Sequence, residues 1–257
     1  MADATPPHTA GFYPSVAADR VLRFRTCRLT VTTDAWPYAV AEADAIDRHW
    51  QRRSSENPAL FNGVIHMLRT ATVEADHFDG AFLRTNFKSY LYWREQGFPA
   101  AGIRDAFGSA LLRSREGHVL LGRQGGGNLN AGQAYLPGGF IDHRDVAANG
   151  AIDIDGSILR ELHEETALEP AEFEVRPGYI VTFSGPLLSI GLELQSSLDA
   201  ATLRTRILSH IAREKNSELT DILIVRSPSD LEGQAIVPYA AQLLEWLFAE
   251  APQAGLS

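Results

Sequence analysis

The sequence predicts a mixed α/β (α+β) fold in which helices pack against a sheet. Three observations lead to this prediction. Segments rich in β-forming residues alternate with segments of helical spacing along the 257 residues. The composition, 45% hydrophobic and 21% charged, is that of an ordinary globular protein. The stretch GFPAAG at 97–102 divides the chain, so we expect an N-terminal α+β domain over 1–100 and a second domain over 101–257.

The first hundred residues are expected to hold structure of their own. In AVAEADAIDRHWQRR (39–53), Ala43, Ile46 and Trp50 recur at helical spacing, and the following Asn57-Pro58 ends the pattern. The elements expected in order are a loose proline-containing arm over the first 15 residues, one or two strands at 20–33, this helix, and strands at 63–76 and 78–93, the second running into a short helix near Tyr90–Gln96.

The remainder of the chain alternates strands with helices. Pro170 ends the first of these helices, since proline cannot continue one. The expected segments are strands at 105–114 and 118–124, a flexible glycine-rich loop at 125–133, the helix containing RELHEETAL (160–168), strands at 172–183 and 187–198, a helix at 199–214, a strand at 221–227 and a helix at 239–250.

Charge and composition narrow the class of protein. The formal net charge of -9 argues against a general nucleic-acid binder, which needs a basic face. No stretch approaches the ~20 apolar residues of a membrane helix. The opening MADATPPHTAGFYPS lacks the basic and apolar regions of a secretory signal, and the single cysteine, Cys27, fits a reducing compartment. We expect a cytoplasmic protein without nucleic-acid or membrane partners, and its oligomeric state stays open.

The stretch RELHEETAL places three carboxylates on one side of a helix. With 3.6 residues per turn, Glu165 lies about 40° from Glu161, and Glu164 about 60° away on the other side. Like charges at this spacing repel. A solvated surface is one explanation, but no lysine is interleaved to relieve the repulsion. Carboxylates grouped in this way suit a hard divalent cation such as Mg²⁺, which takes oxygen ligands and binds substrate phosphate.

The residues before this helix strengthen the case for a metal site. Gly138 and Gly139 follow a predicted strand, and a glycine carbonyl can approach a metal closely because no side chain obstructs it. Asp145 follows in the next loop. The order is therefore a strand, a Gly-Gly turn, a loop carboxylate and an acidic helix.

This arrangement resembles the Nudix hydrolases, whose fold is an α/β/α sandwich with a mixed sheet. Their signature is Gly, five residues, Glu, seven residues, then Arg-Glu-apolar-any-Glu-Glu-any-Gly-apolar. The matching positions here are Gly139, Arg160, Glu161, Leu162, Glu164, Glu165 and Leu168. Three features depart from the pattern. Asp145 replaces the loop glutamate, Ala167 replaces the glycine and makes a left-handed helix end less easy, and the loop is seven residues longer, with the excess in 146–156.

The resemblance implies a pyrophosphohydrolase that uses Mg²⁺ or Mn²⁺ to cleave a nucleoside diphosphate linked to another group. Glu161 and Glu165 are the first candidates for metal ligands, completed by Glu164 and the Gly139 carbonyl. The general base is either one of these glutamates or a later loop glutamate, Glu218, with Glu214 behind it. For both Glu218 and Glu214, an ordinary exposed loop residue is the simpler interpretation. His143 and His163 are interpreted as bystanders.

Several residues are candidates for substrate contacts. Arg123 ends a strand and is either a phosphate ligand or a surface arginine, and Arg84, Asn86 and Lys88 are expected on one strand face that meets a sugar or phosphate, or solvent. Trp50 and Phe61 offer rings for stacking on a base, although core packing is the better explanation of both.

The front of the chain is similar to that of the animal UDP-glucose pyrophosphatase branch of Nudix proteins, through AIDRHWQRR, NPALFNG and KSYLYW. This implies cleavage of UDP-glucose or UDP-galactose to UMP and a hexose 1-phosphate. ADP-ribose and NADH are the alternative substrates. A Nudix-fold sensor that binds a nucleotide without hydrolysing it is the alternative from another class, but such a module has no need for three mutually repelling carboxylates.

Overall fold

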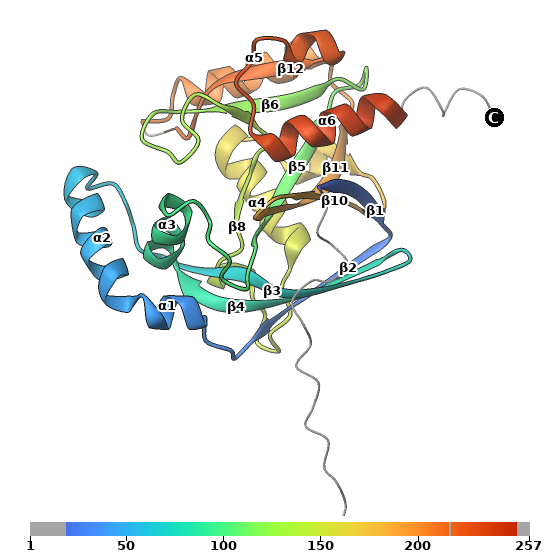
Figure 1. Ribbon diagram of the computed structural model, residues 1–257. Helices are drawn as coiled ribbons and strands as arrows, with labels where there is room; N and C mark the ends of the chain where they lie inside the picture. The colour runs from blue at the N-terminus through green and yellow to red at the C-terminus, as the bar shows by residue number, and fades with distance from the viewer. Residues whose placement is uncertain (1–18, 216, 251–257) are drawn as a thin grey trace, which may run out of the picture.

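The computed structural model describes residues 19–215 and 217–250, and Figure 1 shows the course of the chain. The expected N-terminal arm lies outside the described residues. Among those described, no helix is long and apolar enough to cross a membrane. The front of the chain forms β1 (Arg20–Phe24), β2 (Thr26–Thr32), α1 (Pro37–Ala41), α2 (Ala43–Glu56), β3 (Val64–Glu74), β4 (His77–Asn86) and α3 (Phe87–Glu95).

The back of the chain contains the longer strands and helices in the predicted order, but β7 and β8 were not predicted as strands, and the strand expected at 172–183 is divided into β9 and β10. Short 3₁₀ helices, η1 to η3, punctuate its loops. The elements are β5 (Asp105–Arg113), β6 (Val119–Gln124), β7 (Ala134–Tyr135), β8 (Gly138–Phe140), η1 (His143–Asp145), α4 (Ile154–Thr166), η2 (Pro170–Glu172), β9 (Phe173–Val175), β10 (Tyr179–Ser184), β11 (Leu187–Ser196), α5 (Ala200–Ile211), β12 (Leu219–Val225), η3 (Pro228–Leu231) and α6 (Pro238–Glu250).

Within the described residues, the larger sheet has nine strands in a mixed arrangement. Its central order is β1-β10-β11-β5-β6-β12, and β7, β8 and β9 add to β6, β5 and β11. β11 and β5 run parallel along nine paired positions, from Leu187 opposite Asp105 to Gln195 opposite Arg113. The other pairs in this sheet are antiparallel.

Two neighbouring residues of β5 show that helices cover both faces of this sheet, because successive side chains of a strand point to opposite sides. A Cβ added to Gly108 would meet Ile154 and Ile158 of α4. Phe107 instead packs against the ring of Tyr239 in α6, with 4.9 Å between the ring centroids. α4 and α6 therefore lie on opposite faces (Figure 1), and the predicted fold class is confirmed.

The smaller sheet, in the order β2-β4-β3, contributes to two hydrophobic cores. Leu29 and Phe82 join the main core beneath the larger sheet. Met67 and Leu83 pack with Trp93 of α3 in a second core. Phe82 and Leu83 are consecutive residues of β4, so the two cores lie on opposite faces of the smaller sheet.

β1 joins the front of the chain to the larger sheet. Arg20–Phe24 pairs antiparallel with β10 along Tyr179–Phe183, and only Arg25 separates β1 from β2 of the smaller sheet. The main core likewise combines side chains from before and after Gly97–Gly102. The packing therefore crosses the expected boundary, and the division into domains at residue 100 stays a prediction.

Of the stretch 146–156, expected to enlarge a loop, residues 154–156 begin α4 and the segment 146–152 is bonded to the edge of the smaller sheet. Val31 N of β2 donates to Gly150 O at 2.8 Å, and Ile152 N donates to Leu29 O at 2.9 Å. Gly150 adopts a φ of 81° in the turn, a conformation that favours glycine. Because β2 is otherwise an edge strand, the segment covers backbone groups that would be left unpaired.

A buried carboxyl lies where α3 meets the larger sheet. Asp105, at the first position of β5, is 4% exposed. Its Oδ2 accepts a hydrogen bond of 2.8 Å from the hydroxyl of Tyr90, whereas Oδ1 has no partner among the described residues. Burial raises the pKa of Asp105 from its ordinary 3.8 to about 6, although the Tyr90 hydroxyl and the Arg94 charge oppose the rise. Ionised Asp105 therefore destabilises the junction.

We predict that Asp105→Asn flattens the pH dependence of stability. Native Asp105 keeps its proton up to about pH 6, whereas the unfolded side chain loses it near 3.8. The free energy of unfolding should therefore fall as the pH rises through this interval, by on the order of 2 kcal/mol. Urea titrations from pH 4 to pH 8 measure the slope. Asn can still accept from Tyr90, and Asp34→Asn, at an exposed loop position, is the control. Parallel slopes for wild type and Asp105→Asn would contradict the prediction.

Candidate active site

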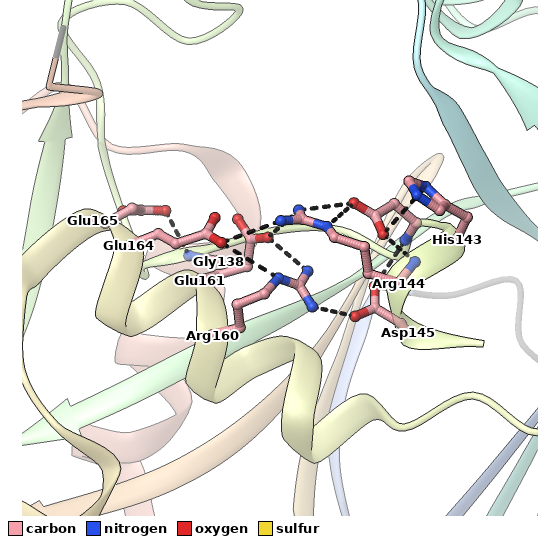
Figure 2. A network of polar contacts seen from close by, with 9 residues as sticks. Gly138, His143, Arg144, Asp145, Arg160, Glu161, Glu164 and Glu165 are labelled. Atoms are coloured by element: carbon pink, nitrogen blue, oxygen red, sulfur yellow. Dashed lines mark hydrogen bonds and ion pairs between the residues drawn. The ribbon is translucent and has the colours of Figure 1, made fainter. Parts of the chain in front are cut away.

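The acidic sector of α4 is positioned by the opposite face of the helix. Ile158 and Leu162 are fully buried against the larger sheet. The helix begins after Asp153, whose side chain accepts a hydrogen bond of 3.0 Å from Gly156 N. With the apolar face fixed in this way, the carboxylates of residues 161–165 face β8 and the loop that follows it (Figure 2).

Glu165 is the most buried of the three carboxylates, at 6% exposure. Its Oε2 accepts a hydrogen bond of 2.8 Å from the Tyr135 hydroxyl, and its Oε1 accepts one of 3.0 Å from Gly138 N. Burial raises the pKa of Glu165 well above its ordinary range, and the two donors oppose this effect. Gly138 and Gly139 were expected in a turn after a strand, but both lie in β8, where they pair with β5. Glu165 therefore connects the helix to β8, and a cation nearby would favour its ionised form.

Glu161 lies directly against Gly139. A Cβ at position 139 would overlap the Glu161 carboxylate, so no larger residue fits there without a shift. Oε1 of Glu161 accepts a hydrogen bond of 2.9 Å from Arg160. Burial raises the pKa of Glu161, and the Arg160 guanidinium opposes the rise. Two residues predicted from the sequence, Gly139 and Glu161, are thus in contact.

Asp145 anchors the arginine of the helix. It is 3% exposed, its Oδ1 pairs with Nη1 of Arg160, and its Oδ2 accepts a hydrogen bond of 2.8 Å from Asp142 N. The shorter side chain therefore reaches Arg160 while also closing the turn of η1. Since Arg160 also contacts Glu161, the pair aligns the start of the acidic sector with the loop.

The structure adds Arg144, which the sequence did not single out, to this group. Its Nη1 lies 3.2 Å from Oε1 of Glu164, and its Nη2 lies 3.8 Å from Oε1 of Glu161. The same guanidinium also contacts Asp142, with Nε and Nη2 each 2.8 Å from Oδ2. Figure 2 shows the side chain extending from the loop to the helix carboxylates.

The oxygen atoms of this region are of the type that divalent cations bind. Glu161, Glu164 and Glu165 offer carboxylates, and the absence of a side chain at Gly139 keeps the adjoining turn accessible. Across the described residues, however, no three His, Cys, Asp or Glu side chains converge as a metal site. Figure 2 shows instead that the guanidinium of Arg144 reaches both Glu161 and Glu164.

Glu218 lies close enough to α4 to influence its charges. Its backbone carbonyl accepts a hydrogen bond of 2.7 Å from Gly125 N, so the glycine-rich loop lies beside it. Although the side chain is exposed at the surface, partial desolvation and the charge of Glu164 raise the pKa of Glu218. Glu214 instead follows the end of α5, where its N–H donates to His210 O at 3.1 Å.

The candidate substrate contacts have different surroundings. Arg84 is exposed and pairs in register with His66 of β3, whose N–H donates to Ile141 O beside η1 at 2.9 Å. Lys88 lies in α3 and forms an ion pair with Asp47 of α2. The expectation that Lys88 shares a strand face with Arg84 is therefore wrong. The cause is Asn86, whose side chain caps α3 and ends β4.

Arg123 and the two histidines have local partners. Arg123 donates to Gly132 O at 2.8 Å and to Oε1 of Gln234 at 2.7 Å. His143 lies near Asp142, at 3.9 Å, and His163 lies near Glu169 at the end of α4, at 3.7 Å. These contacts stabilise loops, and a direct role in binding phosphate stays a prediction for Arg123.

The two aromatic candidates differ in exposure. Trp50 packs its ring edge against Phe87, with 6.4 Å between centroids. Phe61 is 82% exposed, so the expectation of core packing is wrong for this residue. It lies in the irregular segment before β3, where the turn at Asn57-Pro58 has ended α2 and no element covers the ring.

α4 ends in the left-handed conformation without a glycine. Ala167 has φ 52° and ψ 24°, and its N–H donates to His163 O at 2.8 Å. The helix end of the signature is therefore formed despite the substitution, at a steric cost of roughly 1–2 kcal/mol for a residue with a Cβ. The next residue, Leu168, is 1% exposed and enters the core.

No family model and no curated protein matches the chain. Among solved structures it is similar to the Nudix hydrolase RenU from M. smegmatis, with 16% identity over 60% of this chain and 89% of that one and a TM-score of 0.40. The MutT protein from Methanosarcina mazei Go1 matches at 19% identity over 58% and 95%, also with a TM-score of 0.40. A bifunctional NMN adenylyltransferase/ADP ribose pyrophosphatase from Francisella tularensis, complexed with AMP and a Mn ion, matches at 18% over 63% and 46%, with a TM-score of 0.40. Similarities this low do not transfer an activity.

We predict that Ala167→Gly stabilises the protein. Glycine removes the steric cost of the left-handed conformation but loses more backbone entropy on folding, so the net gain in the free energy of unfolding should be about 0.5–1 kcal/mol. Urea denaturation measures it. Ala212→Gly is the matched control. Ala212 caps α5 in the right-handed conformation, so this substitution should lower the stability of the protein. Equal effects of the two substitutions would contradict this account.

Proposed function

We propose that this protein is a Nudix-type pyrophosphohydrolase, dependent on Mg²⁺ or Mn²⁺, that acts on a small nucleoside diphosphate derivative. The observation that carries the proposal is the placement of Glu161 against Gly139, with Glu164 and Glu165 on the same side of α4. A purely structural helix would gain nothing from three adjacent carboxylates, two of them largely buried and with raised pKa values.

In this proposal the side chains of the site have separate tasks. When bound, the divalent ion neutralises the diphosphate and lowers the pKa of a water. Glu161, Glu164, Glu165 and the Gly139 carbonyl would hold it, and Asp145 keeps Arg160 beside Glu161 so that the first carboxylate stays in place. Glu218, whose pKa is raised, takes the proton of the attacking water, with a helix glutamate as the alternative base.

We predict that Glu161→Gln and Glu165→Gln each lower kcat at least about 100-fold. The reason is loss of a ligand charge, since both side chains keep their size. Glu218→Gln should lower kcat by a similar factor while the affinity for Mn²⁺, measured by calorimetry, stays unchanged. Thermal melts establish that each variant is folded.

The assignment of ligands is contradicted if Glu161→Gln turns over normally in excess Mg²⁺. Nucleotide binding by the wild type without release of any monophosphate would contradict the enzyme and favour a sensor. If only a helix variant alters a pH-dependent step, Glu218 is not the base.

The substrate class is the finer part of the proposal. We infer that the front of the chain recognises the nucleoside or sugar, because selectivity must come from groups remote from the diphosphate. Arg84 is exposed one strand away from the segment Ile141–Asp142, and Phe61 presents an uncovered ring. Together with the front-chain resemblance, these residues favour UDP-glucose or UDP-galactose, with ADP-ribose and NADH as alternatives.

We predict that UDP-hexoses are cleaved with Mg²⁺ to UMP and that their kcat/KM exceeds that of ADP-ribose. Arg84→Gln should lower this ratio about tenfold, the effect of losing one charged contact, with little change in the melting temperature. Arg28→Gln, at an exposed position of the same small sheet, is the control. Product analysis over UDP-sugars, ADP-ribose, NADH and a dinucleoside polyphosphate decides the class. Intact UDP-sugars beside cleaved ADP-ribose or NADH would refute the UDP-sugar assignment alone.

A further inference from the structure

The guanidinium of Arg144 contacts two of the carboxylates that are expected to hold a metal ion, those of Glu161 and Glu164. It approaches Oε1 of Glu164 at 3.2 Å and Oε1 of Glu161 at 3.8 Å. We propose that Arg144 is a built-in cation that competes with the divalent metal for these two carboxylates. Binding of the metal then requires withdrawal of this side chain. The inference rests on the proposed metal site and concerns how that site is loaded.

Two arginines contact the same pair of carboxylates, and their surroundings decide which one can leave. Arg160 also approaches Oε1 of Glu164, at 3.7 Å, but its ion pair with Asp145, which is 3% exposed, secures it. Arg144 is 47% exposed on its side chain. An exposed ion pair contributes little and breaks easily, whereas the loss of one partner from a buried pair is costly. Arg144 is therefore the one that yields.

Asp142 binds both the backbone and the guanidinium of Arg144. Its Oδ1 accepts a hydrogen bond of 2.6 Å from the backbone N of Arg144, and its Oδ2 contacts Nε and Nη2 at 2.8 Å. Asp142 N is in turn bonded to Asp145. The contact with Asp142 does not depend on the helix carboxylates. When the guanidinium turns away from Glu161 and Glu164, the hydrogen bond from the backbone N of Arg144 to Asp142 is kept, so the residue stays close to the site.

The proposed competition predicts in which direction metal affinity and stability change when the guanidinium is removed. Without metal, the positive charge of Arg144 relieves the repulsion between Glu161 and Glu164, which lie three residues apart on one helix. With metal, the dication provides that relief and the two contacts are lost. Removing the guanidinium should therefore tighten metal binding and destabilise the metal-free protein. If Arg144 had a merely structural role, its removal would leave metal affinity unchanged or weaken it.

Arg144→Gln in the full chain tests the proposal through binding of Mn²⁺, measured by electron paramagnetic resonance of the free ion and by calorimetry. The Kd for Mn²⁺ should fall about three- to tenfold, corresponding to the loss of two partly exposed ion pairs that compete with the metal. In EDTA the melting temperature should fall, and saturating Mn²⁺ should raise it more than in the wild type. Arg176→Gln is the matched control, because Arg176 is equally exposed at 47% and pairs with Glu174 at 3.0 Å. It should change neither Kd nor the response to Mn²⁺.

The outcomes separate the inference from the proposed function. Binding of Mn²⁺ by the wild type, with an unchanged or higher Kd in Arg144→Gln, overturns the competition and leaves the metal site standing. Binding only by Arg144→Gln supports the competition in its strongest form. If neither protein binds Mn²⁺, both the metal site and the competition are refuted. If Arg176→Gln tightens binding as much as Arg144→Gln, a general charge effect replaces the specific one.

Discussion

Three carboxylates on one face of α4 must be neutralised, and much of the surrounding structure meets that requirement. Arg160 extends between Glu161 and the buried Asp145, Arg144 spans Glu161 and Glu164, and Tyr135 with Gly138 donates to Glu165. Together these contacts join the helix to η1, β7 and β8. The pairing of these carboxylates therefore determines how η1, β7 and β8 pack against α4. The apolar face of the helix determines only how deeply α4 is buried.

The front of the chain is held to this site by backbone pairing as well as by packing. β3 contacts the loop of the site through His66 N and Ile141 O, and α3 brings Tyr90 to Asp105 at the start of β5. The ring of Phe140, which follows Gly139, packs on Tyr90 with 4.8 Å between centroids. A change in the front sheet can thus reach Gly139 in β8 through these contacts.

Local periodicity and residue type predicted the longer elements and the acidic face of α4, because both depend on near neighbours in sequence, but they missed the short strands β7 and β8, which form by pairing with β6 and β5. The association of Gly139 with Glu161 was also predictable, from a motif whose spacing implies proximity. Arg144 was not, since nothing local distinguishes it from any loop arginine. Its partners lie 17 and 20 residues further along the chain.

Other failures have the same origin in contacts between distant residues. β1 reads as part of the front region, but its partner is β10, more than a hundred residues away. The sequence pattern places Lys88 in a strand. It lies in α3 instead, because the side chain of Asn86 caps this helix just before it. Phe61 is of a residue type that is common in cores, and only the tertiary arrangement leaves it exposed. The left-handed end at Ala167 shows the converse, because tertiary packing imposes a conformation that the residue disfavours.

The pairing of segment 146–152 with β2 has an evolutionary consequence. The expected lengthening of the loop before α4 lies in this segment, and β2 belongs to the smaller sheet, an extension at the front of the chain. Each supplies backbone partners for the other through Val31 with Gly150 and Ile152 with Leu29. A lineage that lost the extension would leave the lengthened loop with unpaired N–H and C=O groups, and the reverse loss would expose an edge strand. The two additions are therefore expected to be inherited as one unit, so that a relative with a short loop should also lack the front sheet.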